Sequence, residues 1–153
     1  MLYEAIAHGA TGLMYWGTMT IPPDHPFVAD LAACFQEVET LSRYLVGESV
    51  QGEVTCENEA IRICQKRTAE GDDLWIVLNE SAESITASLM GKLPAELGVV
   101  GEARKVRAES GMLAEAFGPY GLHVYHDATR PLAKPLRRPD IRRRLTEQAI
   151  INP

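Results

Sequence analysis

The sequence predicts an α+β protein in which a helix–strand–helix unit precedes an antiparallel β-sandwich. In the first 47 residues, apolar residues recur with helical spacing on both sides of a short apolar run, and from residue 48 they alternate with polar ones. Turn residues then separate short strands at intervals of ~8–12 residues. The chain of 153 residues has room for one domain, or for a small domain and a fragment of another. We therefore divide it into segments 1–47, 48–127 and 128–153.

The first segment is predicted to form a helix, a strand, a loop and a second helix. Apolar residues of the first helix share one face and Gly9 ends it; they are Leu2, Tyr3, Ile6 and Ala7. The run Gly12–Gly17 does not alternate, which is typical of a strand buried on both faces of a parallel sheet. After a proline-rich loop, apolar positions from Val28 to Val46 mark one face of a long helix. One strand cannot bury itself, so this unit is incomplete alone.

The second segment is predicted to be all-β, a sandwich or barrel. Leu74–Leu78 is expected to be a central strand covered on both sides, because apolar residues fill all its positions. Glu57–Glu59 suits a tight turn between two short strands. The other strands are expected at 54–56, 61–63, 85–89, 99–106, 112–117 and 122–125.

The third segment, Ala128–Pro153, has seven basic residues against two acidic ones, a net charge of +5, whereas the rest of the chain carries −11. Three prolines interrupt it, so a solvated, mobile tail is expected. Contact with nucleic acid is the alternative, but no aromatic residue lies among the arginines to stack on a base. Nucleic acid is therefore not an expected partner.

Composition excludes several classes of protein. Hydrophobic residues make up 46% of the chain and charged residues 24%, which excludes wholesale disorder. No apolar run approaches the ~20 residues of a membrane-spanning helix, and the first residues do not resemble a secretory signal. Cys34, Cys56 and Cys64 are expected to be buried free thiols, without metal-ligand spacing. Unpaired cysteines favour a reducing compartment such as the cytoplasm, although the compartment stays open.

The residues His8–Gly17 (HGATGLMYWG), with the following loop and helix, resemble the last β/α unit of a (β/α)8-barrel, or TIM-barrel, glycoside hydrolase. In many such enzymes a small β-sandwich follows the eighth helix, and here DLWIVLNES and FGPYGLHVYHD resemble its central and closing strands. The resemblance covers about residues 3–127. It implies that the chain is the C-terminal portion of such an enzyme, with carbohydrate bound through the parent barrel and the missing barrel segment, or another chain, as partner.

The resemblance also implies a role for one aromatic residue. Barrel active sites lie at the C-terminal ends of the strands, where Trp16 is expected. An indole offers a flat surface to the C–H face of a sugar and an N–H to a hydroxyl group. We therefore predict that Trp16 contacts substrate, with Tyr15 beside it. The alternative is that both rings only plug the barrel mouth or pack under a loop.

Hydrolysis of a glycosidic bond needs two carboxyl groups flanking it. In the resembling barrels these usually follow earlier strands, and the acids of the first segment, Glu4, Asp24, Glu37 and Glu39, are all expected to be solvated surface residues. We therefore expect no catalytic residues and no glycosidase activity in this chain alone. No cofactor or metal is expected, since neither nucleotide-binding fingerprint is present and His123 and His126 should point to opposite faces of a strand.

A different class of function stays open, namely a self-contained, non-catalytic β-sandwich that acts as a binding or interaction module. In that case the run Gly12–Trp16 should join the sandwich and the long helix should cover it. In a barrel fragment, these surfaces should instead stay exposed. A third possibility is that the short strand pairs with another chain to give a dimer.

Overall fold

The computed structural model describes residues 2–14 and 20–132. In this part of the chain there are two helices, α1 (Leu2–Ala7) and α2 (Pro26–Leu45), followed by nine strands. The strands are β1 (Glu48–Val50), β2 (Val54–Thr55), β3 (Ile61–Arg67), β4 (Asp73–Asn79), β5 (Ile85–Gly91), β6 (Glu96–Val99), β7 (Arg104–Arg107), β8 (Met112–Phe117) and β9 (Leu122–Asp127). Neither helix is long and apolar enough to cross a membrane.

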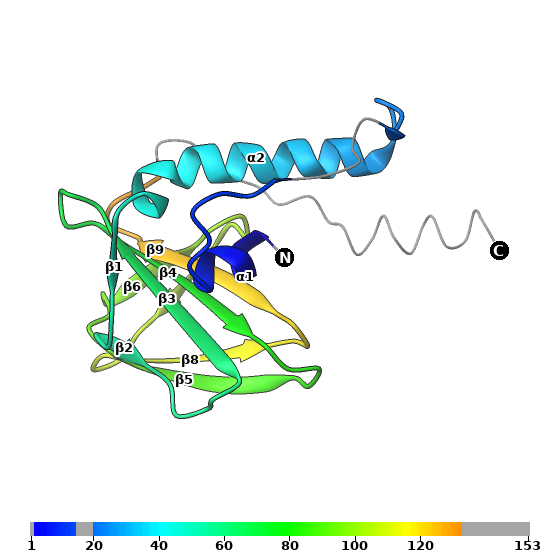
Figure 1. Ribbon diagram of the computed structural model, residues 1–153. Coiled ribbons are helices and arrows are strands. Elements are labelled where there is room, and N and C mark those ends of the chain that lie inside the picture. Colours follow the sequence, from blue (N-terminus) through cyan, green and yellow to red (C-terminus); the bar gives the residue numbers. More distant parts are fainter. Residues whose placement is uncertain (1, 15–19, 133–153) are drawn as a thin grey trace.

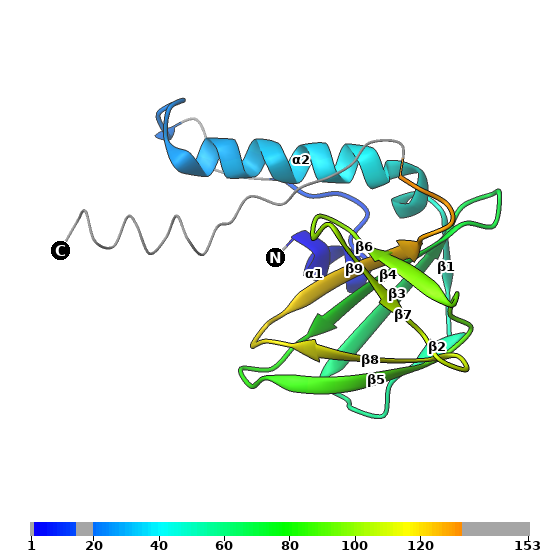
Figure 2. The ribbon, with the colours of Figure 1, turned by 180° about the vertical axis from the view of Figure 1, so that it is seen from behind.

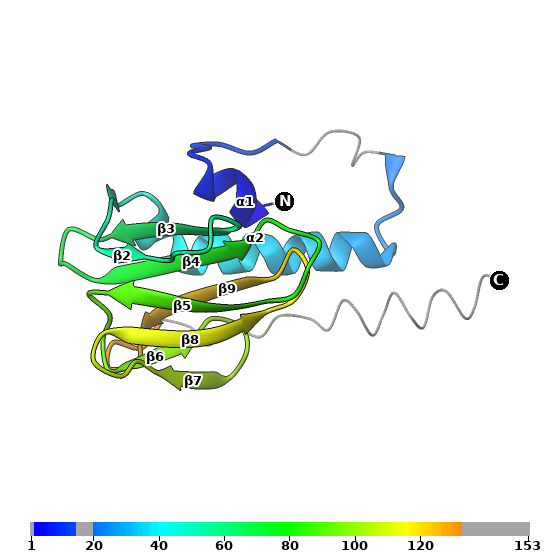
Figure 3. The same cartoon turned by 90° about the horizontal axis from the view of Figure 1, so that it is seen from below.

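The strands form two antiparallel sheets that face one another as a β-sandwich (Figures 1 and 3). The larger sheet has the order β1-β3-β4-β9-β6-β7, and the smaller one the order β2-β5-β8. Trp75, Val77 and Tyr125 of the larger sheet meet Leu89 and Phe117 of the smaller one in a shared core. The predicted α+β class and antiparallel sandwich are thus confirmed.

Both helices cover the outer face of the larger sheet. Tyr3 of α1 and Leu41 and Tyr44 of α2 form a second core with Leu74 and Ile76 of β4. The N-terminal half of α2 extends beyond the sheet, as Figure 1 and the reverse view in Figure 2 both show. Because β4 lies between two cores, its residues Leu74–Leu78 are all buried, as the continuous apolar run predicted.

Local sequence explains where the helices begin and end. At the start of α2, the His25 ring accepts a hydrogen bond from the backbone N–H of Phe27, and Pro26 occupies the first turn, where its missing N–H costs nothing. After α1, Gly9 adopts a φ of 92°, the left-handed conformation that favours glycine at a helix end. Both predicted helices are therefore confirmed.

One detail of the strand prediction is wrong, and the pairing around one predicted turn is a new finding. The expected strand 99–106 is two strands, β6 and β7, because the turn at 100–103 reverses the chain. The strands on either side of Glu57–Glu59 do not pair, since β2 pairs with β5 while β3 pairs with β4 in the other sheet. The tight turn therefore carries the chain from one sheet to the other, which local alternation cannot distinguish from a hairpin.

The predicted strand Gly12–Trp16 is described only as far as Met14, and residues 12–14 are not in a strand. A strand needs a neighbour for its backbone hydrogen bonds, and no strand of the described sheets pairs with these residues. Tyr15 and Trp16 lie outside the described residues, as does the basic tail beyond Leu132.

Candidate functional site

Helix α2 has apolar side chains on two opposite sides. At 3.6 residues per turn, Leu41 and Tyr44 share the side that packs on the sandwich. Val28, Leu31 and Phe35 lie on the other side, with Phe35 52% exposed. At the two ends of the helix, Phe27 and Val46 are 40% and 85% exposed. We call Val28, Leu31 and Phe35 the outer face of α2.

The segment between the helices also exposes apolar side chains. Leu13 is 47% exposed and Met14 85% exposed. These two residues lead directly to Tyr15 and Trp16, the predicted sugar-contacting residues, whose placement the structure does not describe.

A polar contact joins α1 to α2. The Tyr3 hydroxyl donates a hydrogen bond to the carboxylate of Glu37, and both residues are buried. The prediction that Glu37 is a solvated surface residue is therefore wrong, whereas Glu4, Asp24 and Glu39 are exposed as predicted. Helical spacing could have predicted that Glu37 is buried, because Glu37 lies one turn before Leu41 on the side that packs on the sandwich.

The end of α1 contacts the end of β4. His8 Nε2 lies 2.8 Å from Glu80 Oε1, and Arg62 of β3 donates to the same carboxylate from Nε at 2.5 Å. The hydrogen bond from Arg62 outweighs the opposing effect of burial and lowers the pKa of Glu80. This carboxylate therefore joins α1 to the sandwich as an anion.

A charged network closes the sandwich between its edge strands β7 and β8. Arg104 donates to Glu102 from Nε at 2.7 Å and to Glu115 from Nη1 at 2.9 Å. His123 Nδ1 lies 2.6 Å from Glu102 Oε1, and its Nε2 lies 3.3 Å from the carbonyl oxygen of Ala116. His123 faces the core and His126 the opposite side of β9, as predicted. We call Glu102, Arg104, Glu115 and His123 the edge network.

The electrostatics of the edge network indicate a structural role. Burial raises the pKa of the Glu102 carboxyl, but hydrogen bonds from Arg104 and His123 outweigh it, so the pKa is lowered. Burial also raises the pKa of the neighbouring Tyr125 phenol. Within the described residues no group of three or more His, Cys, Asp or Glu side chains could hold a metal ion. The three cysteines are partly buried.

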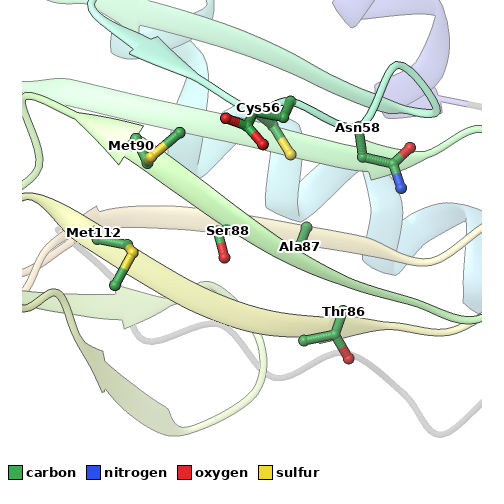
Figure 4. Close-up of a pocket in the computed structure, with 8 residues that line it drawn as sticks. Cys56, Asn58, Thr86, Ala87, Ser88, Met90 and Met112 are labelled. Atoms are coloured by element: carbon green, nitrogen blue, oxygen red, sulfur yellow. The ribbon is translucent and has the colours of Figure 1, made fainter.

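A shallow pocket of about 360 Å³ lies on the outer face of the smaller sheet (Figure 4). The turn after β2 supplies one side and strands β5 and β8 supply the floor. Its lining residues are Cys56, Glu57, Asn58, Thr86, Ala87, Ser88, Met90 and Met112. The sequence analysis did not predict this pocket, because it depends on β2 and β5 being neighbours in one sheet.

No family model matches the sequence, and no curated protein matches it. Among solved structures, an Anoxybacillus α-amylase matches 74% of this chain at 17% identity with a TM-score of 0.52. AmyP in complex with maltose matches 54% at 20% identity, and AmyP in complex with maltotriose matches 57% at 18% identity, with TM-scores of 0.43 and 0.48. The matches cover 24%, 17% and 17% of those chains respectively. The chain therefore shares the fold of part of an α-amylase.

Proposed function

We propose that this chain is the C-terminal portion of a (β/α)8-barrel glycoside hydrolase. Residues 1–47 would supply the last β/α unit, residues 48–127 the sandwich that braces the barrel, and residues 128–153 a basic tail. The fold likeness to part of the Anoxybacillus α-amylase, a glycosyl hydrolase, supports this assignment. The chain spans about a quarter of that neighbour, so most of a barrel would have to come from elsewhere.

The observation that carries the proposal is the pair of apolar sides on α2. One side packs on the sandwich through Leu41 and Tyr44, and the outer face, with Phe35, points the other way. In a (β/α)8 barrel each helix packs on the strands. A last helix followed by a sandwich therefore needs two apolar sides, one for each layer. The exposed Leu13 and Met14 are what an eighth strand without its neighbours would present.

In this proposal Trp16, with Tyr15, lies at the mouth of the barrel and contacts the sugar. The chain would bind substrate there without cleaving it, because the two carboxyl groups that hydrolysis needs would come from the missing segment. The AmyP structures hold maltose and maltotriose, which makes these sugars the first ones to test.

A non-catalytic sandwich module is the second candidate, and one observation favours it. Helix α1 and the C-terminal half of α2 are already packed on the larger sheet. Tyr3 of α1 donates a hydrogen bond to Glu37 of α2, and His8 pairs with Glu80 of the sandwich. A self-contained module would bury its first segment in this way.

Hydrogen exchange of the full chain separates the two candidates. In a barrel fragment, the amides of residues 26–36 should exchange at least tenfold faster than those of residues 38–45, because the N-terminal half of the helix extends beyond the sheet. A module should protect the whole helix evenly, and that result would contradict the proposal. Phe35 is 52% exposed whereas Tyr44 is buried, so Phe35→Asp should cost much less stability than Tyr44→Asp, which should unfold the chain in either case.

A further inference from the structure

The strands of the smaller sheet present no charged side chain on their outer face. Side chains alternate along its strands, so Ala87, Leu89 and Leu113 are buried while their neighbours point outward. The outward residues are Thr55, Thr86, Ser88, Met90, Met112, Ala114 and Ala116. Charged residues make up 24% of the chain, and an exposed sheet face normally has its share of them. This face is therefore suited to a neutral ligand.

Cross-strand pairing shapes the pocket on this face. Ser88 lies opposite Ala114, and these small side chains leave a low floor. At one end Met90 lies opposite Met112, and these residues are 37% and 47% exposed. Figure 4 shows Met90 and Met112 at the same end of the pocket, with Ser88 and Thr86 further along. The pocket thus has an apolar end and a polar floor.

Asn58 lies on the rim with its amide held in place. Its Oδ1 accepts a hydrogen bond from the backbone N–H of Ala60 at 3.0 Å, which leaves the two amide N–H groups to donate elsewhere. The carboxylate of Glu57 beside it accepts hydrogen bonds, and the hydroxyls of Thr86 and Ser88 both donate and accept. The pocket therefore offers donors and acceptors together, with one negative charge at the rim.

We propose that this pocket binds a neutral saccharide ring. A pyranose has C–H faces that pack on thioethers and hydroxyl groups that donate and accept, so it matches both the apolar end and the polar groups. An anionic ligand would be repelled by Glu57. The choice of a sugar as the ligand rests on the proposed function, whereas the observation that the outward strand positions are uncharged is independent of it. The residues that line the pocket all belong to the segment 48–127, so the pocket would hold a chain of sugar residues on the sandwich, outside the barrel.

The expected affinity is low. The pocket is open and shallow, and methionine side chains lose rotamer freedom when they order against a ligand. A dissociation constant of about 1–10 mM is therefore expected.

The test is a titration of the ¹⁵N-labelled full chain with maltotriose, followed by amide chemical shifts. Saturable shifts should be confined to residues 56–58, 86–90 and 112–116. Sorbitol has the hydroxyl groups without the ring face, so it should give shifts at least tenfold smaller at the same concentration.

Two variants sharpen this test. Ser88→Asp puts a charge on the floor and should weaken maltotriose binding at least tenfold, while Ser84→Asp, in the exposed turn before β5, should leave it unchanged. Asn58→Asp keeps the acceptor for Ala60 and removes the amide donors, and it should weaken binding about threefold or more.

Shifts that do not saturate, equal shifts with sorbitol, or shifts centred elsewhere would overturn the proposal. A concentration-dependent fall in translational diffusion without sugar, with amide shift changes at residues 86–90 and 112–116, would show that a second copy covers this face, which also overturns the proposal. Neither result affects the exchange pattern of α2, so failure here is distinguishable from failure of the proposed function.

Discussion

Arg104 of β7 and Glu115 of β8 join the edge strands of the two sheets, with Nη1 of the arginine 2.9 Å from Oε2 of the glutamate. Neither sheet continues beyond these strands in the described part of the chain. The ion pair therefore closes the side of the sandwich, and Glu102 and His123 hold the arginine in place.

Replacing Arg104 should destabilise the folded sandwich. Arg104→Gln leaves Glu102 and Glu115 without their cation, and we expect a loss of about 1–2 kcal/mol in the free energy of unfolding, discounted because the arginine is 36% exposed. Urea denaturation measures it. Lys105→Gln on the same strand breaks an exposed pair with Glu96 and should cost no more than about 0.5 kcal/mol. Equal losses in the two variants would contradict the role of the edge network.

Stability should fall in acid because of Glu102. Its pKa is lowered in the folded chain, so the folded state binds the proton less tightly than the unfolded state does. The resulting stability is present above the unfolded pKa of about 4.3 and is lost as the pH falls through the lower, folded pKa. The free energy of unfolding, measured by urea denaturation between pH 7 and pH 3, should fall less steeply with decreasing pH for Glu102→Gln than for the wild type. The exposed Glu109→Gln should keep the wild-type slope, and if Glu102→Gln keeps it too, the prediction is wrong.

The contact of α2 with the sandwich should depend on Leu41. This side chain is fully buried between the helix and the larger sheet, so Leu41→Ala should cost about 2–4 kcal/mol. Val46→Ala removes an apolar side chain that is 85% exposed just after the helix and should cost less than about 0.5 kcal/mol. Thermal unfolding of the three chains measures both values. A loss below about 1 kcal/mol for Leu41→Ala would show that α2 is not part of the folded unit.

Gly47 should not tolerate a side chain. It links α2 to β1, and a Cβ atom there would lie 2.2 Å from the carbonyl oxygen of Arg67 on β3. Because this obstacle is backbone, Gly47→Ala should cost about 1–3 kcal/mol by chemical denaturation. Gly12→Ala is the matched control, since a Cβ at that position meets nothing within 4 Å. Similar stability of the two variants would refute the close approach.

Periodicity predicted the elements that depend on local spacing. The helices and the buried strand β4 follow from patterns within 6 to 20 residues, and the structure confirms them. Sequence failed where partners lie far apart along the chain. Whether β2 pairs with β3 or with β5 depends on contacts across 35 residues, between Thr55 and Met90.

The same limit applies to the candidate sites. The pocket needs the turn after β2 to lie beside β5, and the edge network joins Glu102 to His123 across 21 residues. Neither arrangement produces a repeating pattern of residues in the sequence. The uncharged outward positions of β5 and β8 were visible as alternation, but their meaning depends on knowing that the two strands are neighbours.

The overhang of α2 makes the helix a lever. Its 20 residues span about 30 Å, and the described residues that are fully buried, Leu41 and Tyr44, lie at one end. A rotation of about 10° at that pivot would move Pro26 by roughly 5 Å over such a length. Small changes in packing beneath Tyr44 would thus cause larger displacements at the N-terminus of α2. The sandwich can therefore change the position of a group bound at that end of the helix without contacting the group.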